Sequence, residues 1–228
     1  MNEIIRINEE TYRIEDEGVR FFLLTGKEKA LMIDSGMNTP NAKELVKELT
    51  DLPIELLNTH ADRDHISGNG EFEKFYMSPD EEENYRQANG QGQIIPIKEN
   101  DVIDLGERRL KIIDNPGHTP GSVAILDEKY RALVGGDAIQ SGTIFMFGKF
   151  RNIERYVESL KHIKEYINEF DVIYPSHGSF PVYPEIIDKL IEGANTIINK
   201  EAEGKTVEMH GHEVIRYEFP YAGFFCDR

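Results

Sequence analysis

The sequence predicts an α/β protein built on two β-sheets. Short strand-like apolar runs occur in two successive groups, and each group is followed by segments with helical periodicity. A single wound sheet would instead alternate strands and helices one by one along the chain. The length of 228 residues and the hydrophobic content of 39% suffice for a substantial core. We therefore expect a single domain over residues 1–228.

The first group of strands occupies the N-terminal part. Residues 20–24 and 30–33 flank a short glycine-containing turn, which is typical of a hairpin. A helix is expected over residues 40–49, because apolar side chains recur there at helical spacing. Pro40 suits an early helical position, and Thr39 can cap the helix. The strands predicted in this part are residues 4–7, 12–14, 20–24, 30–33 and 54–57.

The second half repeats this pattern. A charged turn joins two predicted strands into a hairpin, and residues 206–219 alternate enough to form a closing hairpin. Helical spacing returns over residues 153–167 and 186–198. The strands predicted in this half are residues 109–113, 122–126, 131–134 and 172–174.

The charge excludes some classes of partner. With 26 Lys and Arg against 42 Asp and Glu, the formal net charge is −16. This charge repels a phosphate backbone and no basic patch offsets it, so we expect no nucleic-acid partner. No apolar run is long enough to span a membrane, and the first residues lack the features of a secretory signal. The lone cysteine, Cys226, excludes internal disulfides, and these features together favour a cytoplasmic location.

Histidine and aspartate gather in loops that follow predicted strands. Strand ends that lie side by side collect such loops at one edge of a sheet, where active sites are commonly built. Imidazole and carboxylate without thiolate suit Zn²⁺, Fe or Mn²⁺ better than a structural zinc. The side chains at these five strand ends are, in chain order, Asp34, the group from His60 to His65, His118, Asp137 and His177.

The richest of these loops is the segment HADRDH at residues 60–65. It offers two imidazoles and two carboxylates within six residues, too many for one catalytic ion that must keep an open position. Two ions about 3.5–4 Å apart would use them all, and Asp137 could bridge the ions.

Each of these side chains alone has a simpler explanation. A histidine after a strand is usually a turn or capping residue, and loop aspartates usually form turns. Their joint occurrence, each beside small Gly or Pro neighbours, favours a common site. His162 faces away from the apolar side of its predicted helix and is expected to be solvated. The role of His210 and His212, two residues apart in the closing hairpin, stays open.

The motifs resemble the metallo-β-lactamase superfamily over essentially the whole chain, nearest to its small glyoxalase II-like members. The motifs are Asp34, HADRDH at 60–65, His118 in GHTPGS, Asp137 in GGD and His177 in PSHG. The resemblance implies an αββα sandwich, in which two mixed sheets pack face to face with helices outside. It also implies a centre with two divalent metal ions, most simply zinc, at one edge.

The resemblance assigns a role to each of these residues. One ion would be held by His60, residue 62 and His118, and the other by Asp64, His65 and His177. Asp137 would bridge the two ions, and Asp34 would orient the ligands from behind.

Asp62 departs from the pattern of the family, which most often has histidine there. As a ligand it would make the centre formally neutral with two divalent ions, two further carboxylates and a hydroxide. Carboxylates suit harder ions, so Asp62 shifts the preference from zinc toward iron or manganese. Flavodiiron proteins, a redox branch of the superfamily, also have a carboxylate here. If Asp62 does not bind, the centre holds one ion.

The predicted function is that of a metal-dependent hydrolase. A metal-bound hydroxide would attack the carbonyl of a small thioester, ester or lactone, and Asp64 is implied to orient it or carry its proton. The alternatives are a non-heme iron redox enzyme, resembling flavodiiron proteins or persulfide dioxygenases, and a non-catalytic metal-binding protein. The oligomeric state is open, with a homodimer as one option.

The substrate-binding residues are less evident. Residues 138–150 are apolar and contain glycine, so they either form a wall over the metals or pack beneath a helix. Few basic residues besides Lys149 and Arg151 flank the expected mouth. Tyr156 and Tyr174 are candidate oxyanion donors, although core packing is the simpler role for both. A small substrate that is neutral or modestly charged is expected.

Overall fold

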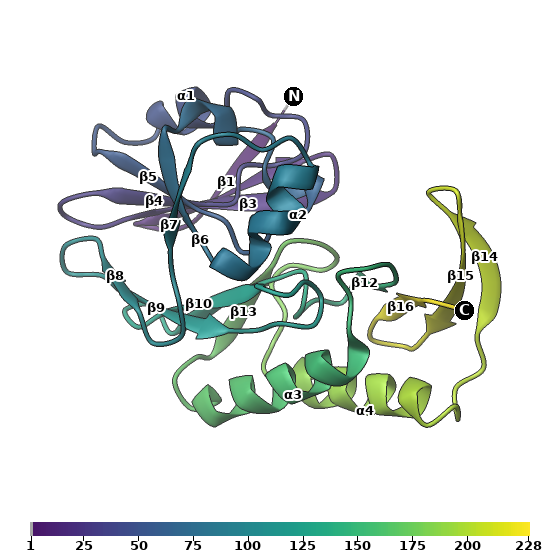
Figure 1. Ribbon diagram of the computed structural model, residues 1–228. Helices are drawn as coiled ribbons and strands as arrows, with labels where there is room; N and C mark the ends of the chain where they lie inside the picture. Colours follow the sequence, from purple (N-terminus) through teal and green to yellow (C-terminus); the bar gives the residue numbers. More distant parts are fainter. Residues whose placement is uncertain (1) are drawn as a thin grey trace.

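The computed structural model describes residues 2–228 (Figure 1). In this part of the chain the first sheet has the order β1-β2-β3-β4-β5-β6-β7. Its strands are β1 (Glu3–Asn8), β2 (Thr11–Asp16), β3 (Val19–Thr25), β4 (Ala30–Ile33), β5 (Ile54–Leu57), β6 (Lys74–Met77) and β7 (Gln93–Pro96). The pairs from β1 to β4 are antiparallel and those from β4 to β7 are parallel, so the sheet is mixed.

The second sheet has the order β13-β11-β10-β9-β8. Its strands are β8 (Val102–Asp104), β9 (Arg109–Asp114), β10 (Val123–Asp127), β11 (Ala132–Gly136) and β13 (Val172–Pro175). Here β11 and β13 are parallel and the other pairs antiparallel. The two sheets bury their facing side chains against each other, with Phe22 and Leu31 from the first and Ile112 and Ile125 from the second.

Helices cover the outer face of each sheet. The α-helices are α1 (Ala42–Lys47), α2 (Glu82–Gln87), α3 (Ile153–Ile163) and α4 (Ile186–Ile198). The short 3₁₀ helices are η1 (Arg63–His65), η2 (Asn69–Glu71), η3 (Pro79–Glu81) and η4 (Lys164–Tyr166). Because side chains alternate along a strand, Phe21 and Leu23 of β3 pack on the helix side while Phe22 packs between the sheets. The α1 and α2 side chains join that outer core, and α3 and α4 form a core with the second sheet. The predicted αββα sandwich is thereby confirmed.

A third sheet stands beside the sandwich and has the order β12-β16-β15-β14 (Figure 1). Its strands are β12 (Thr143–Met146), β14 (Lys205–Met209), β15 (His212–Glu218) and β16 (Gly223–Cys226). The closing hairpin predicted for residues 206–219 exists as β14 and β15. Its further partners, β16 and β12, were not predicted, since β12 lies within the apolar segment 138–150 and pairs across the chain with β16.

Several local predictions are wrong. The helix expected at residues 40–49 is the shorter α1, and Thr39 does not cap it, because the helix begins after Asn41 and has no side-chain cap. The helix expected at 153–167 continues past Ile163 only as the 3₁₀ turn η4. His162 is half-buried rather than solvated. Its ring lies against Glu99, with Nε2 at 3.1 Å from Glu99 Oε1.

None of the helices within residues 2–228 combines the length and apolar character that a membrane span requires.

Candidate metal centre

The structure brings together all seven side chains predicted as metal ligands. They form two groups, and within each group one ligand atom per residue lies within 4.8 Å of the others. The first group is His60, Asp62 and His118, and the second is Asp64, His65, Asp137 and His177. This division matches the one that the resemblance implies. Their binding of ions stays a prediction.

Each side chain comes from a loop at the end of a strand. His60 and Asp62 follow β5, η1 carries Asp64 and His65, and the others follow β9, β11 and β13. The loop that carries His118 lies tightly against α3, since a Cβ on Gly117 would fall 2.3 Å from the Tyr156 backbone nitrogen. Gly117 also has a φ of 128°, a conformation that L side chains rarely adopt. Only glycine therefore allows this loop to approach the helix.

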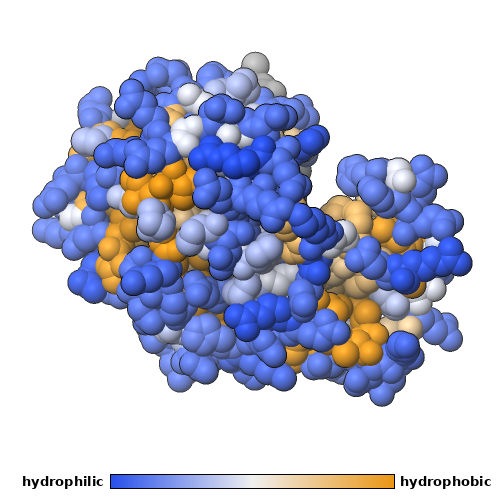
Figure 2. All heavy atoms as spheres, in the orientation of Figure 1, coloured by the Kyte–Doolittle hydropathy of each residue, from blue (hydrophilic) through white to orange (hydrophobic). Residues whose placement is uncertain are grey.

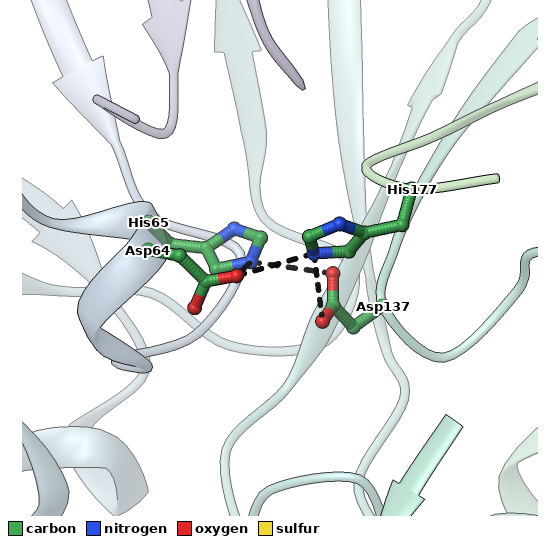
Figure 3. Close-up of side chains that lie close together, drawn as sticks. All are labelled: Asp64, His65, Asp137 and His177. Carbon is green, nitrogen blue, oxygen red and sulfur yellow. Dashed lines mark ion pairs between the residues drawn. The ribbon is translucent and has the colours of Figure 1, made fainter. Parts of the chain in front are cut away.

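The second group is compact (Figure 3). His65 Nε2 lies 3.2 Å from Asp137 Oδ1, and His177 Nε2 lies 3.2 Å from Asp64 Oδ2. The other Asp137 oxygen, Oδ2, is 3.4 Å from His177 Nε2. Figure 3 shows the two imidazoles approaching from opposite sides, with the carboxylates of Asp64 and Asp137 beneath them in this view.

The first group adjoins the second through Asp137. His118 Nε2 is 3.4 Å from Asp62 Oδ2 and 3.7 Å from Asp137 Oδ2. His60 Nε2 is 3.7 Å from Asp62 Oδ2. Asp137 thus contacts imidazoles of both groups, which is the position that a bridging carboxylate needs.

In each of the four histidines of the centre, the outer nitrogen Nδ1 makes a hydrogen bond to another group of the protein. His65 Nδ1 donates to Asp34 Oδ2 at 2.9 Å, His118 Nδ1 to the Phe145 carbonyl at 3.1 Å, and His177 Nδ1 to the Gly18 carbonyl at 2.7 Å. His60 Nδ1 donates to Thr59 Oγ1 at 3.0 Å, because that hydroxyl gives its own proton to Asp34. Each Nε2 is therefore left to face the centre.

These inward atoms fit a divalent cation. The Nε2 atoms of His60, His65 and His118 are buried without a hydrogen-bond partner, and so is Asp137 Oδ1. Buried polar groups without partners are costly, and imidazole nitrogens fixed by outer hydrogen bonds are typical metal ligands. A cation at each group would satisfy these atoms.

Asp34 lies behind the ligands, as expected of a residue that orients them. Its carboxylate accepts hydrogen bonds from the Thr59 amide and the Thr59 hydroxyl, both at 2.7 Å, besides the one from His65. Its φ of 62° is in the left-handed region, which aspartate tolerates better than most residues. Asp34 therefore couples the loop after β4 to the ligand loop after β5.

Asp62 has protein partners on both oxygens. Arg151 Nη2 donates to Oδ2 in an ion pair, and Asn84 Nδ2 donates to Oδ1 at 3.2 Å. Burial alone would raise the pKa of this carboxyl, but the nearby imidazoles of His118 and His60 and the charge of Arg151 hold it well below the usual range. The sequence places Arg151 near the expected mouth but does not indicate its pairing with Asp62, since 89 residues separate the two.

The two groups differ in their electrostatics. In the second group, burial would lower the pKa of His65, but the charges of Asp137, Asp64 and Asp34 outweigh it and raise that pKa well above its ordinary value. Burial would also lower the pKa of His177, but Asp137 and Asp64 outweigh burial and raise that pKa to about 10. In the first group, burial and the nearby Arg151 lower the pKa of His118. The second group thus favours a positive charge more strongly.

Glu81 is a buried carboxylate that sequence reasoning missed. Its Oε2 accepts from the Ala61 amide at 2.8 Å, and its Oε1 accepts from the Gly121 amide at 2.7 Å. It therefore connects the ligand loop of His60 to that of His118. In the sequence it lies in the acidic run 80–83, which resembles a solvated surface and offers no signal of this role.

An open cavity of about 1060 Å³ lies over the centre. Its lining includes Asp64, Asp137 and His177, together with Arg63 and the ring of His210. His212 is not among the lining residues, and within residues 2–228 neither His210 nor His212 belongs to a metal-ligand group.

Neither candidate oxyanion donor reaches the cavity. Tyr156 is fully buried and donates to the Ala138 carbonyl at 2.9 Å. Tyr174 stacks on Phe22 and Phe180. Both tyrosines are core residues.

Comparison with known proteins agrees with the fold and the motifs. The family model of the metallo-beta-lactamase superfamily matches residues 15–203. Among solved structures, the metallo-beta-lactamase from Pontibacter korlensis superposes with a TM-score of 0.72 and covers 84% of this chain and 99% of its own. The sequence identity is 16%, so this likeness concerns the fold alone.

Three curated relatives are similar in sequence. Hydroxyacylglutathione hydrolase of Bdellovibrio bacteriovorus is 31% identical over 203 residues, 85% of this chain and 76% of the relative. The acyl-coenzyme A thioesterase MBLAC2 of Gallus gallus is 30% identical over 83 residues, 36% of this chain and 30% of the relative. The human mitochondrial persulfide dioxygenase ETHE1 is 31% identical over 121 residues, 52% of this chain and 47% of the relative. The chain thus spans less than half the length of the latter two.

Proposed function

Because this chain belongs to the metallo-β-lactamase superfamily, whose members are mostly hydrolytic enzymes, we propose that it is a metal-dependent hydrolase of small thioesters, esters or lactones. The observation that carries the proposal is the convergence of four inward-facing imidazole nitrogens and three carboxylates under one open cavity. The similarity to a thioesterase and to a glutathione thioester hydrolase supports this class of substrate.

The superfamily binds divalent metals, usually zinc, and the residues present would hold two ions. His60, Asp62 and His118 would hold one, and the second group would hold the other, with Asp137 shared. Such ions, when bound, would supply a water with a pKa near neutrality and positive charge for a carbonyl oxygen. Because Asp62 is already paired with Arg151, we expect the second group, with two carboxylates, to bind its ion more tightly.

Asp64 has the position for proton transfer. Its side chain is 29% exposed, against 7% for Asp137, and it lines the cavity. A carboxylate there can accept a proton from the attacking water and pass it to the leaving group.

The test is the metal content of protein purified without added metal, with its absorption spectrum and its turnover of S-acyl-N-acetylcysteamine thioesters. We expect a colourless protein with bound zinc, loss of thioester hydrolysis on chelation, and recovery with zinc. Asp64→Asn should lower kcat by about 100-fold or more. The control is Asp101→Asn, on a surface turn away from the cavity.

An iron enzyme is the second candidate, because ETHE1 is similar over half of the chain and Asp62 adds a carboxylate. Stoichiometric iron with oxygen-sensitive absorption bands, and no thioester turnover with zinc, would replace the hydrolase proposal with this one.

A further inference from the structure

One side of the cavity is made of aromatic rings from the third sheet and from the residue that follows β12. We define the aromatic wall as Phe145, Phe147 and Phe225, all of which line the cavity. The ring centroids of Phe145 and Phe225 lie 5.3 Å apart, and those of Phe145 and Phe147 lie 5.7 Å apart. His210, at the turn between β14 and β15, extends the wall, with its ring 6.3 Å from Phe145. Figure 2 shows a notch between the main body and the smaller lobe of C-terminal strands, with apolar surface on that lobe.

The wall follows from the alternation of side chains in β12 and β16. Ile144 and Phe224 point into the core shared with α3 and α4. The parallel register pairs Phe145 with Phe225, so these two rings share the opposite face of the sheet. The segment 138–150 was expected either to form a wall over the metals or to pack beneath a helix. It does both, since alternate side chains line the cavity and pack beneath the helices.

The aromatic wall is tied directly to the candidate metal centre. The Phe145 carbonyl accepts the hydrogen bond from His118 Nδ1 at 3.1 Å, so the strand that carries the wall also orients this imidazole. His118 and Asp137 line the same cavity as the three rings. The acyl chain of a substrate whose carbonyl lies over the centre would therefore reach the aromatic wall.

The charged side chains lie elsewhere in the cavity. Arg63 and Arg151 line it from the ligand loop and from the segment before α3, and its carboxylates belong to the centre itself. The third sheet contributes no carboxylate, lysine or arginine to the lining. The cavity volume of about 1060 Å³ is at the upper end of pockets that enclose drug-sized ligands, far more than an acetyl group needs.

From this arrangement we infer that the aromatic wall binds the acyl part of the substrate. The preferred substrates are thioesters or esters with an apolar acyl group of several carbons, rather than acetyl or polar hydroxyacyl compounds. This inference rests on the proposed hydrolase function.

The test uses zinc-loaded protein and the acetyl, hexanoyl and decanoyl thioesters of N-acetylcysteamine. We expect kcat/KM to rise along the series, by up to about fourfold for each methylene that the wall buries. Phe147→Ala should reduce kcat/KM for the decanoyl thioester at least about tenfold more than for the acetyl thioester, mainly through KM. Tyr183→Ala, which removes an exposed ring outside the cavity, is the matched control and should change neither.

Calorimetric binding of decanoate gives a readout that does not need turnover. Wild-type protein should bind decanoate, and Phe147→Ala should bind it at least about tenfold more weakly. Hydrolysis with the same kcat/KM for acetyl and decanoyl thioesters would overturn the acyl-binding inference and leave the proposed function intact. Absence of hydrolysis for the whole series would overturn the proposed function. The decanoate titration would then show, without turnover, whether the aromatic wall binds an acyl chain.

Discussion

Asp62 and Arg151 act as a pair at the position where the superfamily most often has a single histidine. The carboxylate adds one negative charge to the first ligand group, and the guanidinium, whose side chain is only 12% exposed, supplies one positive charge against it. The pair therefore has the same net charge as a neutral imidazole. Its Asp62 Oδ2 atom still faces His60 and His118, as a ligand atom would.

This pairing predicts how Asp62→His will behave. The substitution alone leaves the Arg151 cation beside the metal position without its carboxylate, which opposes a divalent ion. Asp62→His/Arg151→Gln removes that charge, so we expect it to bind zinc about tenfold or more tightly than Asp62→His, a difference above roughly 1.4 kcal/mol. Competition with a chromophoric zinc chelator measures both affinities.

Arg155→Gln in the Asp62→His background is the control for that experiment. Arg155 is exposed and pairs with Glu158, so its loss should leave zinc affinity unchanged. Equal zinc affinities for Asp62→His and for the double variant would show that Arg151 does not oppose the ion.

Among the elements, the short helix η3 joins two of the loops that form the centre. Glu81 at its end accepts backbone amides from the loop after β5 and from the loop after β9. The Ser78 hydroxyl accepts a hydrogen bond from the Asp80 amide and so caps the start of η3. One carboxylate on one turn of helix thereby holds two ligand loops at a fixed separation.

Glu81→Gln should weaken both the fold and the centre. The amide NH₂ cannot accept a hydrogen bond, so one of the two backbone amides loses its partner in a buried site. We expect a loss of about 1–3 kcal/mol in the free energy of unfolding, together with weaker zinc binding. Urea unfolding of the metal-free protein and zinc titration measure the two effects.

Glu82→Gln is the comparison variant, because Glu82 is the exposed neighbour in the same acidic run and pairs only with Arg86 on the surface. Unchanged unfolding and unchanged zinc affinity in Glu81→Gln would mean that the two loops hold their positions without this carboxylate.

Across the whole molecule, Arg108 holds the two sheets together where their ends meet. It is 1% exposed and forms an ion pair with Asp127, with Nε at 3.0 Å from Oδ2. It also donates to the Thr25 carbonyl at 3.0 Å and to the Thr11 hydroxyl at 2.7 Å, both in the first sheet. Arg108 therefore satisfies polar groups of both sheets at once.

Arg108→Met should strongly destabilise the protein, because it leaves the Asp127 carboxylate buried without its partner. We expect the free energy of unfolding to fall by about 3–5 kcal/mol, and Arg108→Met/Asp127→Leu to recover much of that loss. Arg109→Met, which removes an exposed arginine paired with Glu128, should be nearly neutral in the same denaturation experiment. A small effect for Arg108→Met would assign the joining of the sheets to apolar packing alone.

Much of the fold could be predicted from apolar patterns. The continuous apolar runs in β3 and β4 are strong signals, because these strands are buried on both faces. The strands β6, β7 and β8 were not predicted, since each has only three or four residues and β7 and β8 carry few buried side chains. The parallel pairing of β12 with β16 joins segments about 80 residues apart, and a local pattern contains no such information.

The chain's own residue order established the composition of the centre: which imidazoles and carboxylates follow which strands, and therefore which family and class of chemistry to expect. That was possible because strand ends carry their loops to one edge of a sheet. The pairing of Asp62 with Arg151, the bridging by Glu81 and the aromatic wall were decided only by tertiary structure. Each depends on contacts between distant segments whose distance in space is set by the packing of sheets and helices, and a spacing along the chain does not encode that distance.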